Sequence, residues 1–530
     1  MKTRLLPALL LAASLSACAA NPGPPPVEEP EPTPESTTSV APETTTPEVP
    51  SRGDQIISVG IDPLPAGFNP HLQAHDSTFT RSLGSLVLPS TFRDGVMDFN
   101  LLESAGEVQP APGTVAQTVR FVISAEAQWS DGTPITGADF RYLWQGMTQT
   151  PGVINPAGYR AIEGIRTSAD GRTVDVDFRT PVVDWREMFD NLLPSHVLQG
   201  DVTRFGTGFD NGVPASAGRY AVENVDRSRG VVTLNRNDRF WGSDPAATDR
   251  VRFQEIRSVT QGVEQLRSGQ LNFLDTVPGE TSVDSYRLMR DTQVRLVDQP
   301  RELTLTMSVT SPLLADQAVR AELHALLDVP LIARLAAGRS AELSIPEHAA
   351  TPGVPSLLPE VTGEQGRPLR IGVDPADDTS LAAARTIVDL LSQSDVRAEM
   401  VTSDLEDLTG VQLPDGEVDA VIVWQRIDSG ALDLAGHWEC PPSPQAPRSG
   451  NLSGYCTEET AGTAAALVDG SVPLDEAAAV FAATNAREHL DVPLLGERRM
   501  LVLGEGIVGP DPDLENWTAG VSTVASWRKP

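Results

Sequence analysis

The chain has 530 residues, of which 72 are acidic and 40 are basic, so its formal net charge is −32. This balance argues against nucleic acid and anionic membrane surfaces as partners, because both require basic patches. Lysine occurs only at positions 2 and 529, and arginine takes its place as the basic residue in the rest of the chain. This preference is typical of GC-rich genomes and indicates an actinobacterial source. The residues after position 53 are numerous enough for two or three folded lobes.

The N-terminus predicts a lipoprotein signal peptide over residues 1–17. Lys2 and Arg4 precede a short apolar run that is too short to span a bilayer as a mature helix. Leu15-Ser16-Ala17-Cys18 resembles a bacterial lipobox, in which Cys18 would carry the lipid. An ordinary secretory signal with a chance cysteine is the alternative.

Residues 18–53 predict a lipidated cysteine followed by an extended tether. Between residues 21 and 50 there are ten prolines, six threonines and six glutamates, and no lysine or arginine. Such a composition buries little apolar surface and repels itself, so we expect this segment to stay disordered. Sugars on its threonines are an open alternative.

Two cysteines remain in the folded part, Cys440 and Cys456. In an oxidising compartment they favour a disulfide, because a metal site would require more ligands nearby than His437 provides.

The folded part begins with an alternating strand through Ile57, Val59 and Ile61 that ends in a turn carrying Asn69 and His71. A strand near residue 121 is followed by a turn and by Thr136 and Asp139, which predict a helix start with a capping box. Residues 172–180 alternate as another strand, and residues 218–241 predict a hairpin or a meander.

The second half predicts a separate α/β lobe. A helix pair is expected over 318–338, a loop over 340–368, and then a strand, a helix and two strands between 368 and 424. No internal repeat is found.

Motifs for catalysis and metal binding are weak. Gly504 to Gly509 matches G-x-G-x-x-G, but prolines follow where a nucleotide site requires a helix. His71 and His75 have helical i, i+4 spacing without a suitable third ligand, so no metal site is expected. No nucleophile is paired with a base, and we therefore expect neither an enzyme nor a cofactor.

Several segments together resemble the extracellular solute-binding proteins of family 5, the dipeptide- and oligopeptide-binding lipoproteins of ABC importers. "WSDGTPITGADF" (129–140) is similar to the family's aromatic-S/T-D-G-x-P-L/I-T-A-x-D-V/F pattern. The other similar segments are "SAGRYAVENV" with "VTLNRNDRFWG" (216–242), "QLRSGQLNFLD" (265–275) and "VRAELHALLDVPLIARLAAG" (319–338).

The resemblance implies an α/β fold of the periplasmic-binding-protein-like type II class, with two lobes and an extra inserted domain. Domain I would comprise residues 54–75, 212–305 and 498–530, and domain II residues 76–211. Domain III, over 306–497, would close on domain I around a ligand. The protein would act as a monomer.

Five ligand-binding residues are expected from the family's cleft positions: Asn69, His71, Trp424, Arg426 and Asp428. Peptide binders of the family have the pattern W-x-x-D-x-x-D-P at the position where this chain has Trp424 to Gly430. The later Asp-Pro of that pattern is absent from this chain. We therefore hypothesise that Arg426 with His71 recognises an anionic or polyhydroxyl head group instead of a peptide amine.

Other segments, including "PAGFNPH" (65–71) and "LVLPSTFR" (86–93), resemble a mycobacterial branch of the family. That resemblance implies a lipoprotein on the outer face of the cell membrane that binds a mannosylated phospholipid. It would act in the assembly of phosphatidylinositol mannosides, lipomannan and lipoarabinomannan, beside a membrane mannosyltransferase. The alternative is the peptide-binding subunit of an importer, with an ABC permease as its partner.

Overall fold

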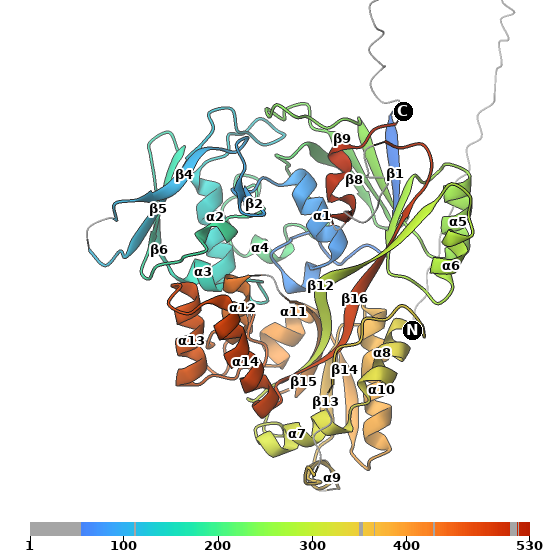
Figure 1. Cartoon of the computed structure of the whole chain (residues 1–530). Helices are drawn as coiled ribbons and strands as arrows, with labels where there is room; N and C mark the ends of the chain where they lie inside the picture. The colour runs from blue at the N-terminus through green and yellow to red at the C-terminus, as the bar shows by residue number, and fades with distance from the viewer. Residues whose placement is uncertain are drawn as a thin grey trace, which may run out of the picture. The chain divides into compact units, whose positions relative to one another are not determined.

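A computed structural model describes residues 55–110, 113–348, 353–364, 366–427, 430–508, 517 and 519–529. Its largest element is a ten-stranded mixed sheet in the order β14-β13-β15-β12-β16-β11-β1-β10-β9-β8 (Figure 1). The strands are β1 (Ile56–Ile61), β8 (Tyr220–Asp226), β9 (Val231–Arg236), β10 (Arg250–Glu255), β11 (Phe273–Thr276), β12 (Gln293–Met307), β13 (Leu369–Val373), β14 (Ala398–Thr402), β15 (Ala420–Arg426) and β16 (Asp491–Leu503).

Two smaller sheets lie between β1 and β8 in the sequence. One is the hairpin of β2 (Phe92–Arg93) and β3 (Val96–Met97). The other has the order β4-β5-β7-β6 and consists of β4 (Leu102–Val108), β5 (Gln117–Ile123), β7 (Thr173–Phe178) and β6 (Ile162–Thr167).

Helices pack around these sheets. Those before β12 are η1 (Gln73–His75), α1 (Thr78–Val87), α2 (Gly137–Gln149), α3 (Ala157–Arg160), η2 (Trp185–Glu187), α4 (Arg204–Thr207), α5 (Val259–Arg267) and α6 (Ser282–Arg287). Those after it are α7 (Gln317–Leu326), α8 (Val329–Ala337), α9 (Leu358–Val361), α10 (Asp378–Ser392), α11 (Leu405–Asp407), η3 (Leu408–Gln412), α12 (Ala431–Trp438), α13 (Glu458–Val468), α14 (Leu474–Glu488) and η5 (Gly520–Ser526).

β1 lies inside the large sheet and pairs in parallel with β10 on one side and β11 on the other. Ile57, Val59 and Ile61 point to one face of the sheet and belong to a buried apolar cluster. The apolar alternation that predicts this strand therefore marks the covered face.

β12 and β16 are the two longest strands, and they run antiparallel beside each other through the middle of the sheet (Figure 1). β12 also pairs with β15, and β16 with β11, so these two strands link the two halves of the sheet. Their pairing is interrupted between Asp298 and Glu302. The predicted boundaries at 305/306 and 497/498 both fall inside these strands.

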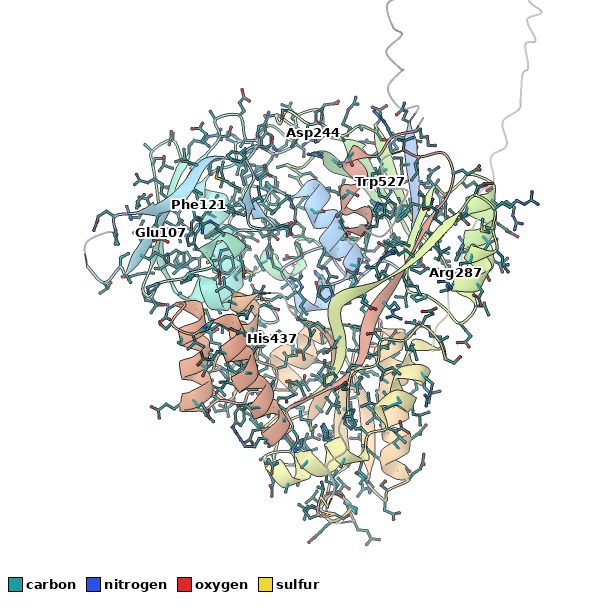
Figure 2. The ribbon with its side chains drawn as sticks, viewed as in Figure 1. Glu107, Phe121, Asp244, Arg287, His437 and Trp527 are labelled. Carbon is teal, nitrogen blue, oxygen red and sulfur yellow. A yellow bond between two sulfur atoms is a disulfide. The ribbon has the colours of Figure 1, made fainter. Side chains whose placement is uncertain are left out.

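Two buried apolar clusters pack against the large sheet, one against each half. The first joins residues of predicted domains I and II, including Phe121, Phe189 and Trp527. The Trp527 ring lies 5.0 Å from that of Phe273, and Phe121 packs edge-on against Phe189 (Figure 2). The second cluster lies between β13, β15, α8 and α10.

Most of the expected elements are confirmed. Thr136 and Asp139 form the capping box of α2, β8 and β9 form the hairpin, and β13, α10, β14 and β15 follow in the expected order. The expected loop over 340–368 is wrong at α9 (Leu358–Val361), where Leu358 is buried against the second cluster.

Candidate functional site

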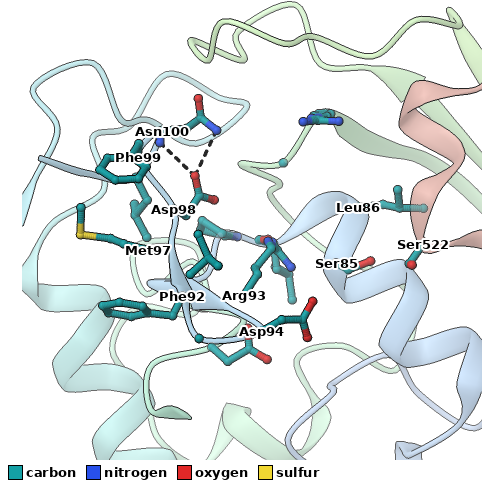
Figure 3. Close-up of a pocket in the computed structure, with 18 of the residues that line it drawn as sticks. Ser85, Leu86, Phe92, Arg93, Asp94, Met97, Asp98, Phe99, Asn100 and Ser522 are labelled. Carbon is teal, nitrogen blue, oxygen red and sulfur yellow. Dashed lines mark hydrogen bonds between the residues drawn. The ribbon is translucent and has the colours of Figure 1, made fainter. Parts of the chain in front are cut away.

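A cavity lined by described residues has a volume of about 1360 Å³, and we call it the main cavity. Ligand pockets in proteins usually measure ~300–1000 Å³, so this one accommodates a large ligand. It is bounded by α1, the β2–β3 hairpin with its flanking residues and η5 (Figure 3). Residues 183–190 and the loop at Phe240 and Trp241 complete the lining. Arg426, at the end of β15, also lines it.

The β2–β3 hairpin supplies the apolar wall of the main cavity. Asp94 and Gly95 have φ angles of 49° and 74°, as a two-residue hairpin turn requires. Beyond the turn, Val96 and Phe99 are 65% and 75% exposed. Asp98 accepts hydrogen bonds from the backbone and side-chain nitrogens of Asn100 at 2.9 and 3.0 Å, which fixes the end of the hairpin (Figure 3).

Residues 183–190, which lie beside the hairpin, add charged groups to the lining. Burial and the carboxylates of Asp184 and Asp433 raise the pKa of Glu187 to about 7. Glu187 also accepts a hydrogen bond from the backbone of Leu432, in the first turn of α12. The cavity therefore combines exposed apolar side chains with ionisable and hydrogen-bonding groups, and its lining is amphipathic.

Beside the cavity lies an ion-pair cluster centred on Asp76, whose carboxylate is fully buried. Ser77 caps α1 by accepting a hydrogen bond from the Thr80 amide at 3.0 Å, so Asp76 stands just before the helix start. Its oxygens lie 2.6 Å from Arg426 Nη2, 3.1 Å from Arg301 Nε and 3.3 Å from Arg81 Nη1. Burial alone raises the pKa of Asp76, but the three guanidinium groups outweigh it and hold that pKa well below its usual range.

Arg426 is one of the predicted site residues, and it lines the main cavity. Its guanidinium also donates to the Pro70 carbonyl, at 3.3 Å, in the turn after β1. Trp424, two residues earlier, is not a lining residue. Its ring is covered by Arg301 at 5.2 Å, and its carbonyl accepts a hydrogen bond from the Gln73 amide.

Asn69 and His71 shape the turn after β1 and do not line the main cavity. The Asn69 amide donates to the Phe205 carbonyl at 2.7 Å, and its side-chain oxygen accepts from the His71 backbone at 3.1 Å. His71 Nε2 lies 3.0 Å from the Asn191 carbonyl, and burial lowers its pKa. The structure brings His71 near Arg426 through Pro70, but Arg426 is already paired with Asp76. The hypothesis of an anion site made by Arg426 and His71 therefore gains no support.

The other residues singled out from the sequence are Cys18, His75, Asp428, Cys440 and Cys456. Asp428 and Cys18 lie outside the described residues. Cys440 and Cys456 form a disulfide. His75 Nδ1 accepts from the Asn69 backbone at 3.3 Å, and the described residues contain no group of three or more His, Cys, Asp or Glu side chains arranged for a metal.

Comparison with known proteins identifies the family. Residues 113–383 match the model of the bacterial extracellular solute-binding proteins, family 5. The chain belongs to family 5. It is 30% identical over 472 residues to the probable monoacyl phosphatidylinositol tetramannoside-binding protein LpqW of Mycobacterium tuberculosis, covering 76% of this chain and 73% of LpqW.

Two further comparisons find that this chain is similar to other family 5 proteins. The oligopeptide-binding protein OppA of Mycobacterium bovis is 27% identical over 296 residues, covering 53% of this chain and 48% of OppA. The solved structure of the Agrobacterium protein AgaA with agropinic acid has a TM-score of 0.68 at 15% identity, covering 90% of this chain and 99% of AgaA. The expected fold class is confirmed, and these family 5 relatives are binding proteins.

No helix in the described part of the chain is long and apolar enough to cross a membrane.

Sequence reasoning missed most of the residues that line the main cavity. Asp94-Gly95 between alternating residues is a strong hairpin signal that could have located the apolar wall. No local signal marks the cluster at Asp76, because its partners Arg301 and Arg426 lie 225 and 350 residues later in the chain and only Arg81 is near in sequence.

Proposed function

We propose that this family 5 protein is a solute-binding lipoprotein on the outer face of the cell membrane and that it binds a mannosylated phospholipid in the main cavity. It would act in the biosynthesis of phosphatidylinositol mannosides, lipomannan and lipoarabinomannan, beside a membrane mannosyltransferase. Cys18 would carry the lipid anchor, since it directly follows the small residues of the lipobox.

The observation that carries the proposal is the amphipathic lining of a cavity of about 1360 Å³. Phe99 and Val96 offer exposed apolar surface to an acyl chain or glycerol backbone, whereas Glu187 and Arg186 of the lining are available to a polar head group. The likeness to LpqW, whose name specifies a mannosylated phosphatidylinositol, agrees with this combination.

Arg426 is the predicted site residue that we retain as a ligand contact. Its side chain is 20% exposed and lines the main cavity while Asp76 balances its charge. A guanidinium in this state still has donors for hydroxyl and phosphate oxygens, but it adds no uncompensated charge.

The second candidate function is the peptide-binding subunit of an ABC importer, in which an ABC permease would be the partner. It is favoured by the likeness to OppA, which is named for oligopeptides. The acidic groups on the wall at Asp184 and Glu187 are the feature of the cavity that suits a peptide amine.

Native mass spectrometry of the full chain in detergent separates the two functions. The protein is challenged with a phosphatidylinositol mannoside, with phosphatidylglycerol and with a mixture of short peptides. We expect a one-to-one complex with the mannolipid that survives competition by phosphatidylglycerol. Tight binding of peptides alone would refute the glycolipid function.

A further inference from the structure

A second, smaller cavity adjoins the main cavity, and we call it the side pocket. Its volume is about 170 Å³, and it shares Ser85, Ala519 and Ser522 with the main cavity. Figure 3 shows Ser85 of α1 and Ser522 of η5 facing each other at this junction. With about one eighth of the main cavity's volume, the side pocket can take only one small group of a larger ligand.

The walls of the side pocket are rich in hydroxyl and amide groups. Thr78, Ser82 and Ser85 come from α1, Ser522 from η5, and Gln299 from the interrupted pairing of β12 with β16. The hydroxyls of Ser85 and Ser522 donate to carbonyls of their own helices, at 2.7 and 2.6 Å, so their oxygens remain as acceptors.

Two further groups in the pocket have unused hydrogen-bonding capacity. Neither the Ser82 hydroxyl nor the Gln299 amide makes a side-chain hydrogen bond to any residue that the structure describes. The pocket therefore presents donors from Ser82 and Gln299 together with acceptors from Ser85, Ser522 and Gln299. A hydroxyl-bearing ring, in which each hydroxyl both donates and accepts, matches this mixture.

The floor of the side pocket is charged but balanced. Arg81 and Arg499 line it, and Asp275 accepts from Arg499 at 2.8 Å. These groups belong to a continuous ion-pair network in which four arginines face four carboxylates: Arg81, Arg301, Arg426 and Arg499 with Asp62, Asp76, Asp275 and Glu497.

This balance decides the class of group that the pocket takes. An added anion or cation would stand beside the network without a counter-charge, and uncompensated charge is costly where water is scarce. An apolar group would leave the polar walls unpaired, which is also costly. A neutral group with many hydroxyls avoids both penalties.

We propose that the side pocket is a subsite for one neutral polyhydroxyl ring, a hexose or a cyclitol, of the ligand in the main cavity. The inference rests on the function proposed above, since a mannosylated phosphatidylinositol carries rings of both kinds. Ser82 and Gln299 are assigned as the residues that determine specificity for this ring.

The test uses the full chain in detergent with the double variant Ser82→Ala, Gln299→Leu. The matched control is Ser392→Ala, Gln393→Leu, at the exposed end of α10 and outside both cavities. The probes are a phosphatidylinositol mannoside, phosphatidylglycerol, free myo-inositol and methyl α-mannoside. Thermal melting checks folding, and Ser522→Trp, at a half-buried position that lines both cavities, is a second variant that fills the side of the pocket next to the main cavity.

Loss of two ligand hydrogen bonds at about fivefold each predicts about 25-fold weaker mannolipid binding by the double variant. The control variant and phosphatidylglycerol binding should not change. If wild type binds the mannolipid and both pocket variants bind it equally well, the subsite is refuted while the proposed function stands.

If wild type binds no mannolipid, the proposed function fails and the free rings decide the subsite alone. Binding of myo-inositol or methyl α-mannoside that both pocket variants abolish would support the subsite. Absence of binding to either ring would refute it.

Discussion

Replacing Asp76 by Asn tests the ion-pair cluster beside the main cavity. The change removes the one carboxylate that contacts Arg81, Arg301 and Arg426, at 3.3, 3.1 and 2.6 Å, while keeping the size of the side chain. Glu497, 3.4 Å from Arg301, is then the nearest remaining counter-charge within this group. Three guanidinium groups would be left in a mostly buried cluster with too little negative charge.

Breaking a buried ion pair by removing one partner costs about 3–5 kcal/mol. At about 1.4 kcal/mol per factor of ten, the folded-to-unfolded ratio should fall by roughly two to three and a half orders of magnitude. The free energy of unfolding, measured by urea titration with tryptophan fluorescence, reports this loss. Asp298→Asn is the control, because Asp298 pairs with Arg498 at 2.6 Å but is 57% exposed, and should cost no more than ~1 kcal/mol.

The pH dependence sharpens this prediction. Because the folded-state pKa of Asp76 is depressed, its stabilising contribution is present above the unfolded pKa of about 3.9 and is lost only as the pH falls below it. The difference between Asp76→Asn and wild type should therefore be constant from pH 5 to pH 8. Equal destabilisation by Asp76→Asn and Asp298→Asn would refute the role given to the cluster.

Three other predictions concern single features. Phe99→Ser should weaken mannolipid binding about tenfold without lowering the melting temperature, because this ring is 75% exposed at the cavity wall; unchanged affinity would contradict the apolar wall. The raised pKa of Glu187, about 7, means that its stabilising contribution is present below pH ~4.3 and is lost as the pH rises through 7. Glu187→Gln should therefore reduce the loss of unfolding free energy between pH 5.5 and pH 8, and identical pH slopes would argue against the shifted pKa. Reduction of the disulfide between Cys440 and Cys456, or the double change of both to Ser, should cost about 3 kcal/mol in urea titrations, since it closes a loop with a sequence separation of 16.

Local patterns predict the elements whose stability is local. The capping box of α2 depends on Thr136 and Asp139, three residues apart, and β1 shows its burial directly in the alternation of Ile57 and Val59. The β13-α10-β14-β15 order is likewise visible, because each strand is short, apolar and separated by a turn or an amphipathic helix.

Of the two longest strands, β12 was not predicted as a strand and β16 was not predicted at its full length. Pro300 in β12 and Pro493 in β16 interrupt the pattern, and proline disfavours an interior strand. The structure accommodates them at irregular pairings, between Asp298 and Glu302 and next to the step from Leu303 to Thr304. Such compensation is a tertiary feature that periodicity does not reveal.

The site was predicted only in part, for a related reason. Arg426 was expected to face a ligand, but its main partner is Asp76, 350 residues earlier in the chain. Asn69 and His71 were expected at the site from their place after β1, yet the turn folds their side chains onto Phe205 and Asn191. Side-chain partners that lie so far apart in the chain depend on how the two halves of the large sheet pack together. The pattern of a single sequence does not reveal that packing.

Photo-crosslinking can locate the mannosylated phospholipid that we propose in the main cavity. A phosphatidylinositol mannoside with a diazirine in its acyl chain is bound to the full chain and irradiated, and the labelled peptide is sequenced. We expect labelling of the β2–β3 hairpin and its flank, residues 92–101, that unlabelled mannolipid suppresses and phosphatidylglycerol does not. Labelling elsewhere, or labelling of this hairpin by a photoactivatable peptide and not by the mannolipid, would contradict it.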